Sequence, residues 1–180
     1  ELGGLSCVVG LAVLDVLIDL GVEGARLKWP NDVWIQGSKL AGILVELANR
    51  GSSTIAVIGL GMNIALTPEE RAAVDQPIAD LLSRGVAVDR NSLLMAFVEK
   101  MASYLRHFEH SGFEAFRSAF DAVHLLHRRD VVVHSATEGK SLLTHGSVEG
   151  VGGSGQLLIR TSRGLEEMLG GEVSLRPADY

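Results

Sequence analysis

The sequence predicts an α+β protein in two parts, on three observations. An apolar helical run opens the chain, runs rich in β-branched residues alternate with turn residues over 25–66, and the end of the chain contains only short strand-like runs. The 180 residues are 47% hydrophobic, which is enough for one substantial core or for a medium domain with a small one. We therefore expect a helix-and-strand part at 1–127 and a β part at 128–180.

The first expected element is a buried helix over residues 5–20. The run LSCVVGLAVLDVLIDLG is apolar on nearly every helical face, and Gly21 suits a helix end. The run is too short and too acidic for a membrane span, and it lacks the basic start of a signal peptide. A helix this apolar needs cover on most sides, so we expect the sequence to begin inside a larger domain.

Strands follow in pairs. Pro30 and Asn31 suit the turn between the first two, and the RGSS run at 50–53 suits a hairpin between the last two. The long pair should be antiparallel, and its exposed edge is also suited to self-association. The four expected strands are 25–29, 32–36, 39–49 and 54–66.

Helices then fill the region up to residue 127. Thr67 and Pro68 have the chemistry of a helix start, and residues 77–83 suggest a short helix. Asp89 or Asn91 should open a long amphipathic helix that Gly112 ends, and one more helix should reach about residue 127. The predicted core stripe of the long helix is Leu94, Phe97, Val98, Met101, Leu105 and Phe108.

The β part reads as strands at hairpin spacing, which fits a small barrel of SH3-like size. The Gly-rich run GVGGSG has no following Lys-Ser/Thr, so we interpret it as a hairpin turn and not as a phosphate-binding loop. The runs with strand character are RDVVVH, SLLTHGSVEGV, QLLIRT, LEEML and EVSLR.

Composition excludes several classes of function. The net charge of −6 and the pI near 5.5 argue against a broad nucleic-acid footprint. Cys7 is the only cysteine, so no internal disulfide forms, and a single thiol in an apolar run fits a reducing cytoplasm. The sequence has no cysteine cluster and no HEXXH motif, so we expect the histidines to occupy core or surface positions and not a metal site.

The stretch KWPND at 28–32 contains more chemistry than a turn requires. Asp32 could supply a hard oxygen ligand to Mg²⁺, and Asn31 could donate to an oxyanion, although an ordinary turn explains the same residues. Lys39 follows at the mouth of an apolar strand, where it is either a point charge for a phosphate or carboxylate or a solvated strand end.

The stretch GLGMN places two glycines inside a strand. Gly59 and Gly61 either admit a ligand close to the backbone or form a bulge, and Asn63 could read a nucleobase edge. Position 64 is Ile, so the dinucleotide-binding pattern GXGXXG is not met.

Taken in order, four motifs resemble the biotin protein ligase family from about Leu5 to Arg176. They are KWPND (28–32), KLAGIL (39–44), VIGLGMN (57–63) and GGEVSLR (170–176). The resemblance implies a catalytic domain of mixed sheet and packed helices, followed by a small SH3-like domain.

The resemblance also implies a two-step ligase. In that family the biotin carboxylate attacks the α-phosphorus of ATP, and the resulting biotinoyl-5′-AMP passes biotin to a lysine of a biotin carboxyl carrier protein, such as an acetyl-CoA carboxylase subunit. ATP, biotin and Mg²⁺ are implied. From the composition we expect a cytoplasmic protein that spans no membrane and makes no nucleic-acid contact through this portion, and the exposed strand edge would allow a homodimer.

Family positions imply the site residues. Lys39 would be catalytic and would contact biotin together with Trp29, as an apolar wall, and Gly42. Asp32 would also hold the metal. The expected ATP contacts are Lys28, Asn31, Asp32, Gly59, Gly61, Asn63, Glu172 and Arg176.

A Gly/Arg-rich biotin loop of this family does not occur in these 180 residues, nor does a winged helix. We therefore expect the chain to be part of a longer protein and to carry half of an adenylate-forming site. Two alternatives stay open. One is a lipoate–protein ligase-like enzyme, and the other is a non-catalytic dimerisation or biotin-sensing repressor fragment.

Overall fold

The first helix, α1 (Leu5–Asp19), is buried over most of its surface. The computed structural model describes residues 2–51, 53–137, 140–170 and 173–177. Eleven of the fifteen α1 residues are buried, because the first sheet covers one side of the helix while α3 and α4 cover others. Gly21, with φ of 78°, ends the helix as expected, and its N–H bonds to the carbonyl of Ile18 at 2.9 Å.

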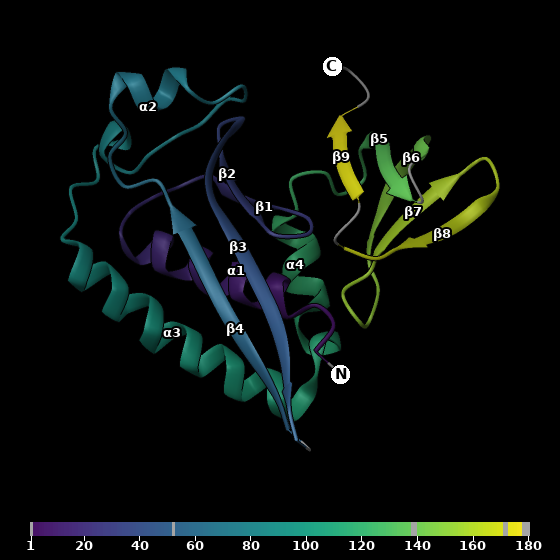
Figure 1. Ribbon diagram of the computed structural model, residues 1–180, viewed down its shortest axis with the longest axis horizontal. Helices are drawn as coiled ribbons and strands as arrows, with labels where there is room; N and C mark the ends of the chain where they lie inside the picture. Colours follow the sequence, from purple (N-terminus) through teal and green to yellow (C-terminus); the bar gives the residue numbers. More distant parts are fainter. Residues whose placement is uncertain (1, 52, 138–139, 171–172, 178–180) are drawn as a thin grey trace.

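The first sheet has four strands in the order β1-β2-β3-β4, and every pairing is antiparallel. Where a mixed sheet was expected, parallel pairing among the described residues is limited to two isolated bridges, Leu27 with His124 and Lys39 with Ile78. In Figure 1, β3 and β4 cross in front of α1. The strands are β1 (Ala25–Lys28), β2 (Asp32–Ile35), β3 (Ser38–Arg50) and β4 (Ser53–Met62).

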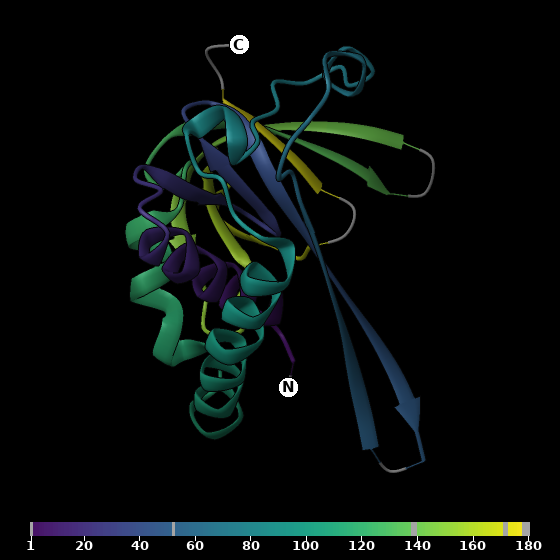
Figure 2. The same ribbon diagram turned by 90° about the vertical axis from the view of Figure 1, so that its left-hand side faces the viewer.

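The β3–β4 pair is the expected long hairpin. Its far half extends well beyond the helices, as Figure 2 shows, and it carries exposed apolar side chains at Leu44, Leu47 and Val57. The near half packs its inner face on α1 through Ile43 and Ala41, which are both buried. The sheet thus has one face committed to the core and one face open.

The connecting helices are α2 (Pro68–Ala72), η1 (Leu82–Arg84), α3 (Arg90–Ser111), η2 (Phe113–Phe116) and α4 (Arg117–Val123). Three expected boundaries are confirmed: Thr67 forms a capping box with Glu70, Asp89 caps α3, and Gly112 ends it. None of these helices is both long and apolar enough to cross a bilayer, in the part of the chain that the structure describes.

Two expectations about these helices are wrong. Residues 77–83 do not form a helix, because the backbone of 77–79 pairs with Lys39 and only the short η1 turn follows. On α3, Leu94 and Val98 are exposed by 59% and 53%, and Leu93 is buried instead. Helix α3 contacts α1 along a stripe that is narrower than its whole set of apolar positions, so Leu94 and Val98 remain exposed to solvent.

The second sheet contains five antiparallel strands in the order β8-β7-β6-β5-β9. Its core residues, including Val133, Val148 and Ile159, belong to the same continuous cluster of buried side chains as those of the first sheet. The two sheets are therefore joined by packing and not by a linker alone. The strands are β5 (Asp130–Thr137), β6 (Lys140–Val151), β7 (Leu157–Thr161), β8 (Gly164–Met168) and β9 (Val173–Pro177).

His124 lies in the packing between α4 and the two sheets. It is 5% exposed, its ring centroid is 5.3 Å from that of Phe120, and both ring nitrogens are buried without a hydrogen-bond partner. Burial, with a smaller contribution from the charge of His127, lowers the pKa of His124 from 6.5 to about 3. The imidazole is therefore neutral in the folded protein near neutral pH.

We predict that His124 makes the fold acid-sensitive. Its folded-state pKa lies below its unfolded value, so its contribution is fully present above pH 6.5 and is lost as pH falls from 6.5 toward about 3. In His124→Phe, the fall in unfolding free energy with decreasing pH should be shallower by about 1.4 kcal/mol per pH unit in that window. Urea unfolding at several pH values measures the slope.

The exposed His145→Gln on β6 controls for the loss of one histidine. Burial raises the pKa of the nearby Asp121 carboxyl, and this contributes a slope of opposite sign at lower pH. The pH slopes of the unfolding free energy of His124→Phe and of wild type are therefore compared at the higher pH values of this window. An unchanged slope in His124→Phe would contradict the prediction.

Candidate functional site

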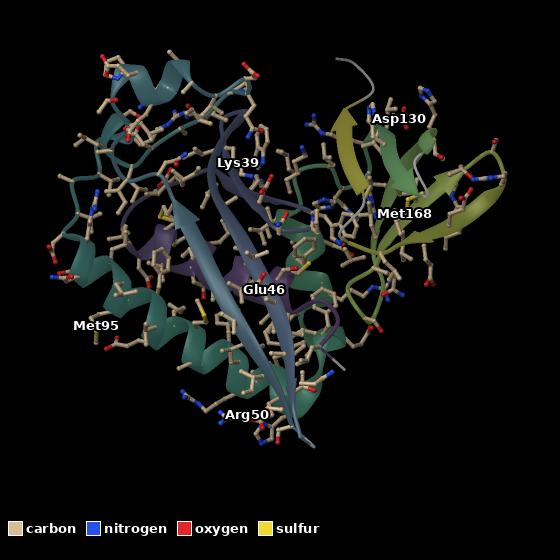
Figure 3. The ribbon with its side chains drawn as sticks, in the orientation of Figure 1. Lys39, Glu46, Arg50, Met95, Asp130 and Met168 are labelled. Atoms are coloured by element: carbon tan, nitrogen blue, oxygen red, sulfur yellow. The ribbon has the colours of Figure 1, made fainter. Side chains whose placement is uncertain are left out.

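A bulge in the first sheet sets the direction of Lys39. The β2–β3 register shifts between Val33, which faces Ala41, and Trp34, which faces Lys39, so β3 has one extra residue at this point. A bulge of this kind reverses the alternation of side chains. Lys39 and Gly42, three positions apart, consequently meet on the outer face of the sheet, and Lys39 lies near the start of β3 in Figure 3.

Lys39 and Asp32 form an ion pair on this outer face. The Nζ atom of Lys39 lies 2.6 Å from Oδ1 of Asp32, and the side chains are 28% and 20% exposed. Asp32 is directly opposite Gly42 in the register. A Cβ atom at Gly42 would lie 3.5 Å from Nζ of Lys39 and 3.6 Å from Oδ1 of Asp32, so glycine leaves the space beside the charges open.

The ion pair lies in a groove of about 420 Å³, a volume suited to a small ligand. Gly42 is opposite Gly61, and Leu44 is opposite Gly59. Because the three glycines have no side chains, the floor of the groove stays open. One part of the lining is charged and another is apolar. The groove is lined by Asn31, Asp32, Lys39, Gly42, Ile43, Leu44, Gly59, Leu60 and Gly61.

The KWPND turn is held rigidly at the edge of this groove. The side-chain amide of Asn31 donates to the carbonyl of Ile43 at 2.8 Å, and the N–H of Ile43 donates to the carbonyl of Asn31 at 2.8 Å. Lys28 pairs with Asp32 across β1 and β2, and its Nζ lies 4.8 Å from the ring centroid of Trp34. Asn31 thus lines the groove and is fixed by contacts within the sheet, whereas Lys28 is not among the lining residues.

Trp29 does not line the groove. It is 2% exposed, and its indole N–H donates to the carbonyl of Gly155, in the turn between β6 and β7, at 2.9 Å. The expected apolar wall for biotin would require Trp29 to leave the core, so its position indicates an anchor between the two sheets. Gly155 has φ of 80°, and a Cβ there would lie 2.3 Å from the Cα of Gly4, so no other residue fits this contact.

Asn63 also turns inward. Its amide donates to the carbonyl of Ala79 at 3.0 Å and lies 3.5 Å from the carbonyl of Lys39. Asn63 therefore joins the end of β4 to the segment beside Lys39 and is not among the residues that line the groove. Of the other expected residues, Glu172 lies outside the described residues, and Arg176 is placed only by its backbone, opposite Val132.

Sequence reasoning missed part of the site. Ile43, Leu44 and Leu60 belong to the lining, but Ile43 and Leu60 are opposite each other in the register and their side chains face the core, so Leu44 is the apolar side chain among them that lies on the outer face. The segment 77–79 beside Lys39 was missed as well. Pro77 was its one available signal, because proline suits a strand edge better than the interior of a helix.

A divalent cation would find only part of its ligands here. Asp32 is the one carboxylate among the lining residues, and no group of three or more His, Cys, Asp or Glu side chains suited to a metal occurs in the described part of the chain. Mg²⁺ commonly uses one or two carboxylates with phosphate oxygens and water. The residues therefore fit Mg²⁺ only if a bound phosphate supplies further ligands.

Comparisons with known proteins agree on one family. The family model described as "Biotin/lipoate A/B protein ligase family" matches residues 2–63. The chain is 34% identical over 177 residues to the "Bifunctional ligase/repressor BirA" of Escherichia coli, covering 98% of this chain and 54% of that protein. It is 32% identical over 175 residues to the "Biotin--[acetyl-CoA-carboxylase] ligase" of Paracoccus denitrificans, covering 94% of this chain and 71% of that protein. The chain thus spans about half the length of the first relative.

Solved structures show the same likeness. The apo biotin protein ligase from Aquifex aeolicus superimposes with a TM-score of 0.84 at 28% identity, covering 99% of this chain and 76% of that chain. The same enzyme "in complex with biotin and ATP" gives a TM-score of 0.80 at 27% identity, covering 99% and 73%.

We predict that Trp29→Phe destabilises the fold by about 1–3 kcal/mol, because the buried carbonyl of Gly155 loses its donor. Trp34→Phe is the matched control, since the indole nitrogen of Trp34 has no hydrogen-bond partner. Urea unfolding followed by circular dichroism compares the two variants. Equal losses of unfolding free energy would show that the bond to Gly155 contributes nothing specific.

Proposed function

Because the chain belongs to the biotin protein ligase family, we propose that it works in an ATP-dependent biotin protein ligase. The enzyme would activate biotin as biotinoyl-5′-AMP and transfer it to a lysine of a biotin carboxyl carrier protein. The observation that carries the proposal is the groove, in which Lys39 and Asp32 lie beside three glycines and an apolar lining. A ligand with an apolar body and a terminal carboxylate matches a groove that has an apolar part and a charged part.

The chemistry of the first step suits Lys39. In that step a carboxylate oxygen of biotin forms a bond to the α-phosphorus of ATP, and the bond to pyrophosphate breaks. Two anions must approach, and negative charge builds on the phosphoryl oxygens, so a fixed cation lowers the barrier. Asp32 holds the ammonium group of Lys39 in place at 2.6 Å, and Gly42 leaves room for the reacting atoms beside it.

Other roles follow from the position of each residue. Leu44 would contact the apolar part of biotin, while Asn31, Asp32 and Lys28 would contact the phosphates. Mg²⁺, held by Asp32 together with the triphosphate, would neutralise phosphate charge. Adenosine would lie along Gly59 and Gly61, next to Asn63, and Glu172 and Arg176, near the end of the chain, would help to close the site. In the second step the carrier lysine attacks the mixed anhydride and releases AMP.

The organisation of the protein is part of the proposal. Residues 1–127 would form the catalytic part and 128–180 a small SH3-like domain. The enzyme would act in the cytoplasm, and the β3–β4 hairpin, with its exposed Leu47 and Val57, would serve self-association into a homodimer. With a net charge of −6, this portion would not contact nucleic acid.

The matching family model also includes lipoate ligases, so lipoate is the competitor in the decisive assay. Biotin-dependent exchange between ATP and labelled pyrophosphate would be measured with this chain, with and without Mg²⁺. Exchange that biotin supports and lipoate does not is the expected result. Exchange supported by lipoate alone would favour a lipoate ligase, and no exchange by the folded protein would contradict adenylation by these residues.

We predict that Lys39→Met lowers the rate of biotin-dependent pyrophosphate exchange by about 10²–10³-fold, because the charge that stabilises the phosphoryl oxygens is removed. Lys39 is partly exposed, so the fold should persist, which circular dichroism would verify. Lys100→Met, which breaks ion pairs with Asp15 and Asp19 away from the groove, controls for the loss of a lysine. Full exchange activity in Lys39→Met would remove Lys39 from the mechanism.

We predict that Gly61→Ala separates binding from stability. A Cβ at Gly61 would lie 3.9 Å from the nearest protein atom, the carbonyl oxygen of Gly42, so the fold accepts it, and alanine in a strand should add up to about 1 kcal/mol of stability. The same methyl group enters the groove, so the affinity for biotin and ATP should fall about tenfold or more. Calorimetric titration and thermal unfolding measure the two effects.

Ala48→Val is the matched control for Gly61→Ala, because Ala48 is exposed on β3 outside the groove and also gains apolar volume. Its ligand affinity should match that of wild type. Unchanged affinity in Gly61→Ala would show that the ligand does not lie over this part of the sheet.

A further inference from the structure

Two backbone hydrogen bonds hold Lys39 from the side opposite β2. The N–H of Lys39 donates to the carbonyl of Pro77 at 2.9 Å, and the N–H of Ala79 donates to the carbonyl of Lys39 at 2.9 Å. Lys39 is the second residue of β3, where a strand would otherwise fray. The segment 77–79 therefore fixes both peptide groups of the residue whose side chain enters the groove.

The ion pair of Arg71 and Asp80 holds this segment in turn. Asp80 is 1% exposed, and its carboxylate pairs with the guanidinium of Arg71 on α2. The Nη1 atom of Arg71 also lies 3.5 Å from the carbonyl oxygen of Ile78, so one planar group contacts the chain on both sides of Ala79. Figures 1 and 2 place α2 at the end of the sheet where β3 begins.

Stability alone does not account for an ion pair whose carboxylate is buried at this place. Replacing such a pair by apolar side chains of similar volume is often neutral or stabilising, whereas a charged pair specifies one geometry. Neither Arg71 nor Asp80 is among the residues that line the groove, so neither is placed to touch a ligand there. Their effect on the site must pass through the backbone of 77–79.

We propose that Arg71 and Asp80 are positioning residues for Lys39. Their ion pair presses Ala79 against β3, which holds the two peptide groups of Lys39 and so keeps its Nζ beside Asp32 and Gly42. The catalytic consequence rests on the proposed function of Lys39 in adenylation. The mechanical part rests only on the hydrogen bonds and the ion pair.

Asp80→Asn tests the proposal, because asparagine keeps the size of the side chain and an acceptor for the N–H of Ser83 but loses the charge. Amide hydrogen exchange in the ligand-free protein should speed up about tenfold at Lys39 and Ala79 and stay unchanged at Ile43, whose bond to Asn31 is independent of the segment. The turnover of biotin-dependent pyrophosphate exchange should fall about tenfold, with the KM for biotin within about twofold.

Three further variants keep the test decisive. If the residues act as a pair, Arg71→Gln combined with Asp80→Asn should be no worse than Asp80→Asn alone. Val148→Ala lowers stability in the core of the second sheet, away from residues 77–79. It should not selectively speed up hydrogen exchange at Lys39 and Ala79, and it should not selectively lower the turnover of pyrophosphate exchange. Arg160→Gln, which breaks an exposed ion pair with Glu149, controls for the loss of an arginine.

Exchange that stays at the wild-type rate at Lys39 and Ala79, or that rises equally throughout the first sheet, would overturn the proposal. So would additive losses in the double variant. If the wild-type protein shows no biotin-dependent chemistry, the proposed function fails, whereas hydrogen exchange at these two amides still decides whether the ion pair positions Lys39.

Discussion

The fold depends on one constraint, which is that α1 must be removed from water on every side. Eleven of its fifteen residues are buried, and no single partner can cover a helix completely. The first sheet therefore covers one side and α3 another, where Tyr104 donates to Asp15 at 2.8 Å and Lys100 pairs with Asp19 at 3.0 Å. Because α1 takes the inner face of the sheet, only the outer face is left for a ligand.

The candidate site is accordingly built on strands, whose pairing makes it rigid. The bulge opposite Val33 and Trp34 brings Lys39 to the same face as Gly42, and the ladder sets Asp32 opposite Gly42. Glycine in the middle of a strand weakens packing, and here it keeps the floor of the groove open beside the charges. A site on paired strands holds its charges more precisely than one on free loops, which suits a reaction that needs a cation already in place.

The KWPND turn links the two sheets to the groove. Trp29 points inward and donates a hydrogen bond to Gly155 in the β6–β7 turn, while Asp32, three residues later, points outward to Lys39. Val151 of the second sheet also donates its N–H to Asp121 on α4 at 3.0 Å. A shift of the β6–β7 turn would therefore displace Trp29 and, with it, the turn that carries Asp32.

The sequence by itself determined the elements whose signals are local. The apolar run of α1, the Thr67 and Asp89 caps and the hairpin around Gly51 are set by residues within a few positions, and the structure confirms them. The motifs also pointed to Lys39 and Asp32, which the structure brings into contact. Only the tertiary structure decided the bulge, the burial of Trp29 and the extended course of 77–79. Those features depend on strand register and on partners far along the chain, as between Trp29 and Gly155, so no local pattern contains them.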